Sequence, residues 1–296
     1  MSTLEKLYFL SPVIIFLVSL IVREKNKELY KSSVFANIDL FYPFIVYVIH
    51  TYLLHGMLLV FPKSFIVEKI GIIKILTIFL DVIGIYFLLS LKKIKIKTLL
   101  HNNNFFSYFI PYINLSIFVF LLLEVILVYF TNKWQSAEIF LEAPTLYYMK
   151  GGGIVLKLIV IFDVILIGPI CEEILFRGFI YTKFKMRYDS VTSIILSSIL
   201  FAISHNPNSI ESIGFIPLGI FFNYLYEKTN YILIPIIAHV VYNFLLTIIN
   251  FYAMLYYEKI IKLVPFNFFL FYFIILTLII VLLEKKYKKI KENLKE

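Results

Sequence analysis

The sequence predicts an all-helical fold, a polytopic bundle of about nine transmembrane helices. Two observations carry this prediction. Of the 296 residues, 61% are hydrophobic and only 16% are charged, and the mean hydropathy of +0.90 is far above that of a water-soluble domain of this length. Apolar stretches long enough to cross a bilayer also recur along the whole chain, and the polar segments between them are too short for a separate soluble domain.

The apolar runs between charged residues define nine candidate helices. They cover residues 7–22, 38–61, 70–91, 105–131, 154–180, 190–205, 212–227, 231–251 and 264–284. Lys and Arg are concentrated in the loops after the odd-numbered helices, which is typical of cytoplasmic loops, so we expect the N-terminus outside and the C-terminus in the cytoplasm. The net charge of +9 therefore fits a multi-pass protein in a lipid bilayer better than a protein that binds nucleic acid.

Two adjacent glutamates lie near the end of the fifth predicted helix. Ionisable side chains are costly inside a bilayer, so each one is a candidate functional or paired group. Glu173 and Arg177 are four residues apart and share a helix face, so Arg177 can neutralise Glu173, whereas Glu172 points about 100° away. Glu172 is the candidate functional carboxylate, and a single structural ion network of all three residues is the alternative.

A turn is expected at Asp189 and Ser190, either of which can cap the helix that follows. An antiparallel hairpin folded there places Glu172 and His205 at equal distances from the turn, roughly 25 Å along each helix. We therefore expect these two side chains to face each other. Phe201 lies one helical turn before His205 and is expected to pack beside its imidazole, where it would keep water scarce.

His239 and Asn243 are four residues apart in the eighth predicted helix, so both project from one side of it. Measured from the preceding turn, they lie at about the depth of Glu172. A lone histidine in such a helix is more often a core residue. Four polar groups at one depth, with His205 as the fourth, favour a functional site because each unpaired group is costly in lipid.

Other polar residues are assigned structural roles. His50 and His55 in the second predicted helix are expected to be packing or interface residues, and Asp81 is expected to be paired or near the membrane interface. Cys171 is the only cysteine, which excludes an intrachain disulfide, and it is expected to behave as a small buried hydrophobe rather than as a nucleophile.

Three short motifs follow one another in the second half of the chain. They are Glu172-Glu173-Ile174-Leu175-Phe176-Arg177, Phe201-Ala202-Ile203-Ser204-His205 and His239-Val240-Val241-Tyr242-Asn243. Each motif is weak alone, but in this order, with Gly178 after the first, the set resembles the CAAX protease and bacteriocin-processing family, also called the Abi family. One departure is Asn223, four residues after Gly219, where such proteins often carry a small residue, and this leaves the packing of the seventh helix open.

The resemblance covers about residues 150–250 and suggests three regions. Residues 1–150 are transmembrane helices without a recognised motif, and residues 151–251 are the helices similar to the catalytic core of that family. Residues 252–296 hold the last transmembrane helix and a basic cytoplasmic tail. A bacterial cell membrane is the expected location.

The family is one of glutamic-type endopeptidases whose active site lies inside the membrane and needs no obligatory metal or other cofactor. By this resemblance, Glu172 is the general base and His205 is its partner in activating water. His239 and Asn243 would bind the oxyanion. The supporting residues would be Glu173, Arg177 and Phe201. The implied substrate is a membrane-associated peptide or protein, such as a prenylated C-terminal peptide, a secreted precursor or a bacteriocin leader.

Two alternatives stay open. Two carboxylates and two histidines are also suitable metal ligands, which would make the protein a metal-dependent membrane peptidase, although their spacing is not the His-Glu-x-x-His of zinc peptidases. A non-enzymatic membrane protein, such as a bacteriocin immunity factor or a scaffold, could keep the same polar cluster for binding.

Overall fold

The computed structural model describes residues 3–26, 35–36, 38–60, 63–91, 93–94, 99, 112–113, 115–117, 119, 153–205 and 210–260. Every regular element within these ranges is a helix, which confirms the all-helical class for this part of the chain. The predicted helices at residues 105–131 and 264–284 lie wholly or largely outside the described residues, as does the basic tail.

The chain forms two compact units. The first contains Met1–His101 and Ile154–Ile236, and the second contains Asn102–Gly153 and Ile237–Glu296. The first unit thus combines the N-terminal helices with the segment that carries Glu172 and His205.

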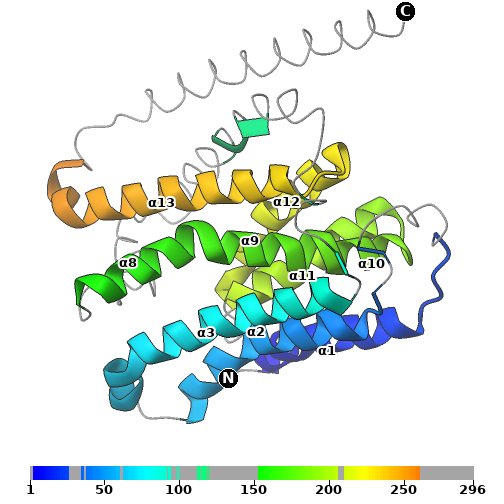
Figure 1. Cartoon of the computed structure of the whole chain (residues 1–296), viewed down its shortest axis with the longest axis horizontal. Helices are drawn as coiled ribbons and strands as arrows, with labels where there is room; N and C mark the ends of the chain where they lie inside the picture. Colours follow the sequence, from blue (N-terminus) through cyan, green and yellow to red (C-terminus); the bar gives the residue numbers. More distant parts are fainter. Residues whose placement is uncertain are drawn as a thin grey trace, which may run out of the picture. The chain divides into compact units, whose positions relative to one another are not determined.

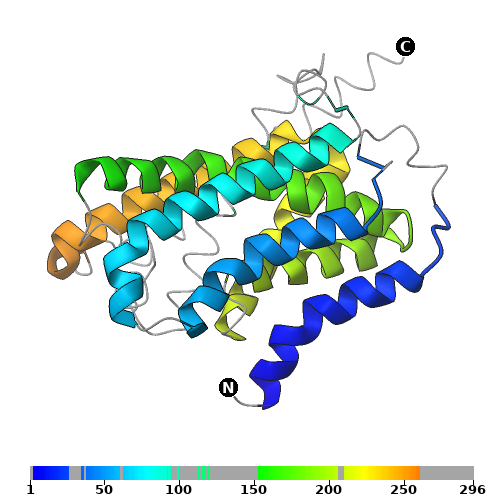
Figure 2. The same ribbon diagram turned by 60° about the horizontal axis from the view of Figure 1, so that its bottom comes forward.

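The N-terminal part of the first unit has three helices. They are α1 (Thr3–Ile21), α2 (Phe41–Val60) and α3 (Lys63–Leu91), of which α2 and α3 pack against each other (Figures 1 and 2). A Cβ atom on Gly84 of α3 would lie 2.9 Å from Val46 Cγ1, so the glycine permits this close approach. The pattern of charges predicts that the third helix begins at residue 70. The earlier start arises because Lys and Glu are good helix formers and extend a helix as readily as they border one.

The fifth predicted helix is one helical rod from Ile154 to Lys185, drawn in green in Figure 1. Along the chain it consists of α8 (Ile154–Phe162), the π-helical η3 (Asp163–Ile167), α9 (Gly168–Glu173), the π-helical η4 (Ile174–Tyr181) and α10 (Thr182–Lys185). Pro169 is the second residue of α9, immediately after Gly168 and close to the end of η3. Proline lacks an N–H and crowds the preceding turn, and the wider π-helical turn accommodates it without ending the rod.

Within the described ranges, the rod is the one helix long and apolar enough to cross a membrane. Shorter apolar helices cover Phe9–Ile21, Ile75–Leu91, Ser190–His205 and Leu233–Ile248. The predicted count of nine transmembrane helices stays a prediction.

After the rod come α11 (Ser190–His205), the 3₁₀-helical η5 (Ile210–Phe215), α12 (Ile216–Thr229) and α13 (Leu233–Ile260). The predicted cap of α11 forms, because the backbone N–H of Thr192 donates to Asp189 Oδ1 at 3.0 Å. Asn230 ends α12 in the left-handed conformation, with φ of 49°. From Ile237 onward, α13 belongs to the second unit.

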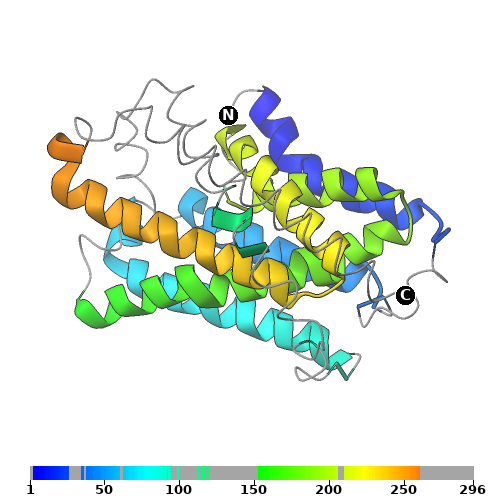
Figure 3. The same ribbon diagram turned by 90° about the horizontal axis from the view of Figure 1, so that it is seen from above.

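The packing of α12 against α11, left open by the sequence, is tight (Figure 3). A Cβ atom on Gly219 would lie 2.9 Å from Ser198 Cα, so the helices touch backbone to backbone. Asn223 is fully buried one turn later, and its Nδ2 donates to Ser198 Oγ at 3.0 Å. A small residue is unnecessary at this position because the serines of α11 satisfy the amide.

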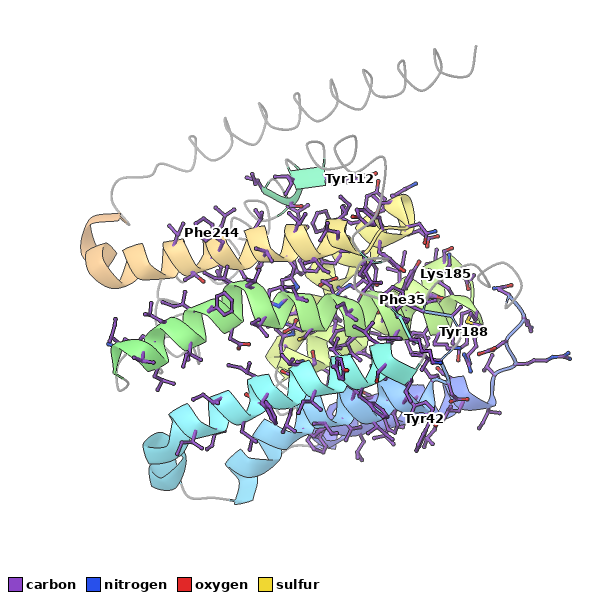
Figure 4. The ribbon with its side chains drawn as sticks, viewed as in Figure 1. Phe35, Tyr42, Tyr112, Lys185, Tyr188 and Phe244 are labelled. Atoms are coloured by element: carbon purple, nitrogen blue, oxygen red, sulfur yellow. The ribbon has the colours of Figure 1, made fainter. Side chains whose placement is uncertain are left out.

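Buried ion pairs hold the connection between α10 and α11. Arg187 and Lys183 both reach Glu24 after α1, at 2.9 Å and 3.5 Å, and Lys185 reaches Glu227 of α12 at 2.7 Å. All three cations are buried, and Figure 4 labels Lys185 in this region. They therefore tie α1 and α12 to the end of the rod.

Candidate active site

Arg177 lies at the centre of the candidate site and is completely buried. Its Nη1–H donates to Glu173 Oε1 at 2.9 Å, and its Nη2–H donates to the carbonyl oxygen of Gly219 at 3.1 Å. The predicted pair of Glu173 and Arg177 is thus confirmed, and it also joins the rod to α12. A buried charge that loses its partner is strongly destabilising, so the pair has a structural task.

Aromatic rings enclose the guanidinium group. The Cζ atom of Arg177 lies 4.4 Å from the ring centroid of Phe201, 5.1 Å from that of Phe222 and 5.9 Å from that of Phe176. The faces of such rings attract a cation, most strongly where water is excluded. Arg177 thereby joins η4, α11 and α12 in one dry cluster.

The two adjacent glutamates have different environments, as the helix geometry predicts. Glu173 is fully buried against Arg177, whereas the side chain of Glu172 is only partly buried. A Cβ atom on Gly168 would lie 3.8 Å from Glu172 Oε1, so the glycine leaves space beside this carboxylate. Glu172 also stands in the short α-helical turn between two π-helical segments, a distortion that is frequent at functional sites.

His205 ends α11 between two aromatic rings. Phe201 meets it edge to face with centroids 4.6 Å apart, as predicted, and Phe215 stacks on it at 4.2 Å with an interplanar angle of 22°. The Nδ1 atom lies 2.8 Å from the carbonyl oxygen of Phe201. A carbonyl only accepts, so Nδ1 carries the proton and Nε2 is the nitrogen that accepts one in the neutral ring. The contact of Phe215 with His205 could not be predicted from the sequence, because the two residues lie on different helices and not at a fixed spacing along one helix.

The hairpin register is visible at Phe176 and Phe201, whose ring centroids lie 5.3 Å apart. Each of these residues is one helical turn nearer the connection than Glu172 and His205, respectively. The contact is therefore the one expected from the predicted hairpin. The approach of Glu172 to His205 stays a prediction.

The second predicted pair lies on the part of α13 that belongs to the second unit. His239 and Asn243 are four residues apart within this helix and share one side of it. The backbone carbonyl of Asn243 accepts from Thr247 Oγ1–H at 2.7 Å, a bond internal to the helix. The convergence of this pair with Glu172 and His205 stays a prediction.

Of the other polar residues, His50 and Asp81 form a pair that links α2 to α3, with His50 Nδ1 and Asp81 Oδ1 2.9 Å apart. Cys171 is buried. Across the described ranges, no group of three or more His, Cys, Asp or Glu residues is arranged so that it could hold a metal ion.

The described residues thus place the partly buried Glu172 next to the buried, neutralised pair of Glu173 and Arg177. Residues 154–245 match the family described as "Type II CAAX prenyl endopeptidase Rce1-like". The resemblance to the CAAX protease and bacteriocin-processing family is therefore confirmed over this part of the chain.

One curated relative is similar to part of the chain. The protein of Bacillus subtilis (strain 168) named "Putative membrane peptidase YdiL" is 32% identical over 78 residues, which are 26% of this chain and 32% of that protein. The match thus spans about one third of the relative's length. No solved structure matches the chain.

Proposed function

We propose that the protein is an intramembrane endopeptidase of the CAAX protease type that hydrolyses a peptide bond in a membrane-associated peptide or protein. The observation that carries this proposal is the separation of the two glutamates. Glu173 is neutralised by Arg177 in a dry cluster, and the adjacent Glu172 is partly accessible at a distortion of the rod. The similarity of residues 154–245 to type II CAAX prenyl endopeptidases supports the same conclusion.

In the proposed reaction, Glu172 takes a proton from a water molecule whose oxygen attacks the carbonyl carbon of the scissile bond. His205 accepts a hydrogen bond from the same water at Nε2, since Nδ1 is held by the carbonyl of Phe201. His239 and Asn243 donate hydrogen bonds to the oxyanion that forms on the carbonyl oxygen. The proton on Glu172 then passes to the amide nitrogen as the carbon–nitrogen bond breaks.

The proposed setting is a bilayer. Residues 1–150 and 252–296 would supply transmembrane helices on either side of the catalytic core at 151–251, with the C-terminus in the cytoplasm. The concentration of cations in alternate loops supports this topology. A C-terminal reporter that is active only in the external compartment should give no signal, and a signal there would contradict the topology.

The test in cells compares the membrane peptidome of cells that carry the wild-type protein with that of cells that carry Glu172→Gln. A precursor that accumulates only in the variant identifies the substrate and supports a peptidase. An identical peptidome, with the cellular function retained, would favour a non-enzymatic binding protein. Activity of the purified protein is then measured with and without a chelator, because chelator-resistant cleavage separates the glutamic-type mechanism from a metal-dependent one.

A further inference from the structure

The pair of His50 and Asp81 connects α2 to α3. The two side chains are 16% and 22% exposed, and Nδ1 lies 2.9 Å from Oδ1. A carboxylate accepts and an imidazole nitrogen donates, so Nδ1 carries a proton toward Asp81 whatever the charge of the ring.

This pair borders the candidate active site. Helix α3, which carries Asp81, packs against α9, which carries Glu172. Both carboxylates act electrostatically on the thiol of Cys171, the residue next to Glu172. On the other side of the pair, the ring of His50 lies 6.4 Å from that of Phe176, between centroids.

The charges around the pair are mostly negative. Asp163 also acts electrostatically on the thiol of Cys171, together with Asp81 and Glu172. Nearby carboxylates disfavour the ionisation of one another. The other ionisable groups on the described parts of the elements packed against α2 and α3 are Lys157 on α8, Glu173 on α9, Arg177 and Tyr181 on η4 and His205 on α11. Arg177 is paired with Glu173.

We propose that His50 is a positioning residue of the peptidase site, which in its protonated form neutralises Asp81 and thereby keeps Glu172 ionised as the general base. The inference rests on the proposed role of Glu172. The N-terminal helices carry no motif of the family, and this inference gives them a direct part in setting the charge state of Glu172. Without the cation, Asp81 would add an uncompensated negative charge beside Glu172, which would then hold its proton more tightly.

The experiment titrates Glu172 directly in the purified full-length protein. The carboxylic-acid carbonyl band of Glu172 is followed by infrared difference spectroscopy against pH and is identified by its loss in Glu172→Gln. In His50→Gln the midpoint should rise by about one pH unit, the usual spread of carboxyl pKa values in folded proteins, because one uncompensated negative charge is added. In the double variant His50→Gln/Asp81→Asn the midpoint should return close to the wild-type value, because the pair is again neutral.

A purely structural role of the pair would give a different pattern, because the double variant removes the ion pair as completely as the single one does. An unchanged midpoint in His50→Gln, or an equal rise in the single and the double variant, would overturn the proposal. If His50→Gln does not fold, His50→Lys supplies a permanent cation and should keep the wild-type midpoint, and a rise there would also overturn it. Glu227→Gln, which breaks the ion pair with Lys185, is the matched control and should not move the midpoint.

The titration also separates this inference from the proposed function. The titration needs no substrate. If the wild-type protein cleaves no peptide, the proposed peptidase function is refuted, but the effect of His50 on the midpoint of Glu172 can still be measured. Conversely, if the enzyme is active but the titration midpoint of Glu172 is the same in the wild type and in His50→Gln, only the proposed role of His50 is overturned. In an active enzyme, the acidic limb of the pH–rate profile should move in parallel with the infrared midpoint.

Discussion

Arg177 Nη1 lies 2.9 Å from Glu173 Oε1, and neither side chain is exposed. This contact distinguishes two adjacent carboxylates, because Glu173 is fully buried against Arg177 and Glu172 is only partly buried. Arg177 also donates to the carbonyl oxygen of Gly219 and stands against three aromatic rings. The same residues that resemble the CAAX protease motif thus form the packing centre of the first unit.

Glu173→Gln should destabilise the protein, because it leaves the charge of Arg177 buried without its carboxylate. Breaking such a pair from one side typically costs about 3–5 kcal/mol. Thermal unfolding in detergent should show a lower midpoint, with lower abundance in membranes. The double variant Glu173→Leu/Arg177→Met removes both charges and should be less destabilised than Glu173→Gln, and a more severe effect would contradict a charge-based explanation.

Gly219→Ala should loosen the contact between α11 and α12. The added methyl group would lie 2.9 Å from both Cα and Cβ of Ser198, and overpacking of this kind typically costs about 1–3 kcal/mol. Gly214→Ala is the matched control, since a Cβ atom there meets nothing within 4 Å. Thermal unfolding should therefore separate the two variants. Equal stability would show that the two helices can move apart without loss.

Asp189 gives α11 an acid-sensitive cap. The hydroxyl and the backbone N–H of Thr192 both donate to its carboxylate and hold the pKa of Asp189 below its usual range. A lowered pKa in the folded state means that the stabilisation is complete above the ordinary pKa of about 3.9 and is lost as the pH falls through the lowered value.

Asp189→Ala should therefore lower the unfolding midpoint near neutral pH. Asp189→Asn keeps a capping oxygen but cannot titrate, so it should keep most of the neutral-pH stability and lose this acid-dependent part. Thermal melts of the three proteins between neutral and acidic pH provide the measurement. An Asn variant as unstable as the Ala variant at neutral pH would show that the cap does not stabilise α11.

Asn243→Ala should leave residual peptide cleavage. In the proposed reaction Asn243 is one of two oxyanion donors, and the loss of one donor typically lowers the rate by about 10² to 10³-fold. Thr247→Ala, one turn further along α13, removes a hydroxyl that bonds only within the helix among the described contacts and should stay near the wild-type rate. Turnover per folded molecule is the measurement, and wild-type turnover in Asn243→Ala would remove this residue from the site.

Relationships along one helix could be predicted from the sequence. The pair of Glu173 and Arg177, the contact of Phe201 with His205 and the cap at Asp189 all depend on spacings of three or four residues, which the helix geometry fixes. The register of the hairpin follows from a single expected turn, and the contact of Phe176 with Phe201 agrees with it.

Relationships between helices could not be predicted in the same way. The sequence leaves open whether Asp81 is paired or near the membrane interface and does not indicate His50 as its partner. It also gives no indication that Phe215 stacks on His205. Such contacts depend on how helices distant in sequence are arranged. The π-helical segments on either side of α9 are also invisible in the pattern, because one extra residue per turn leaves the apolar composition unchanged.

The central claim is that Glu172 is the general base, and cleavage per mole of folded, detergent-purified protein tests it most directly. The substrate is the precursor that accumulates in cells carrying Glu172→Gln, and the variants compared are Glu172→Gln, His205→Ala and Glu173→Gln. Glu172→Gln and His205→Ala should stay nearly as abundant as the wild type and cleave nothing measurable, whereas Glu173→Gln should lose stability as well as activity. Cleavage by Glu172→Gln at the wild-type rate per folded molecule would contradict the mechanism.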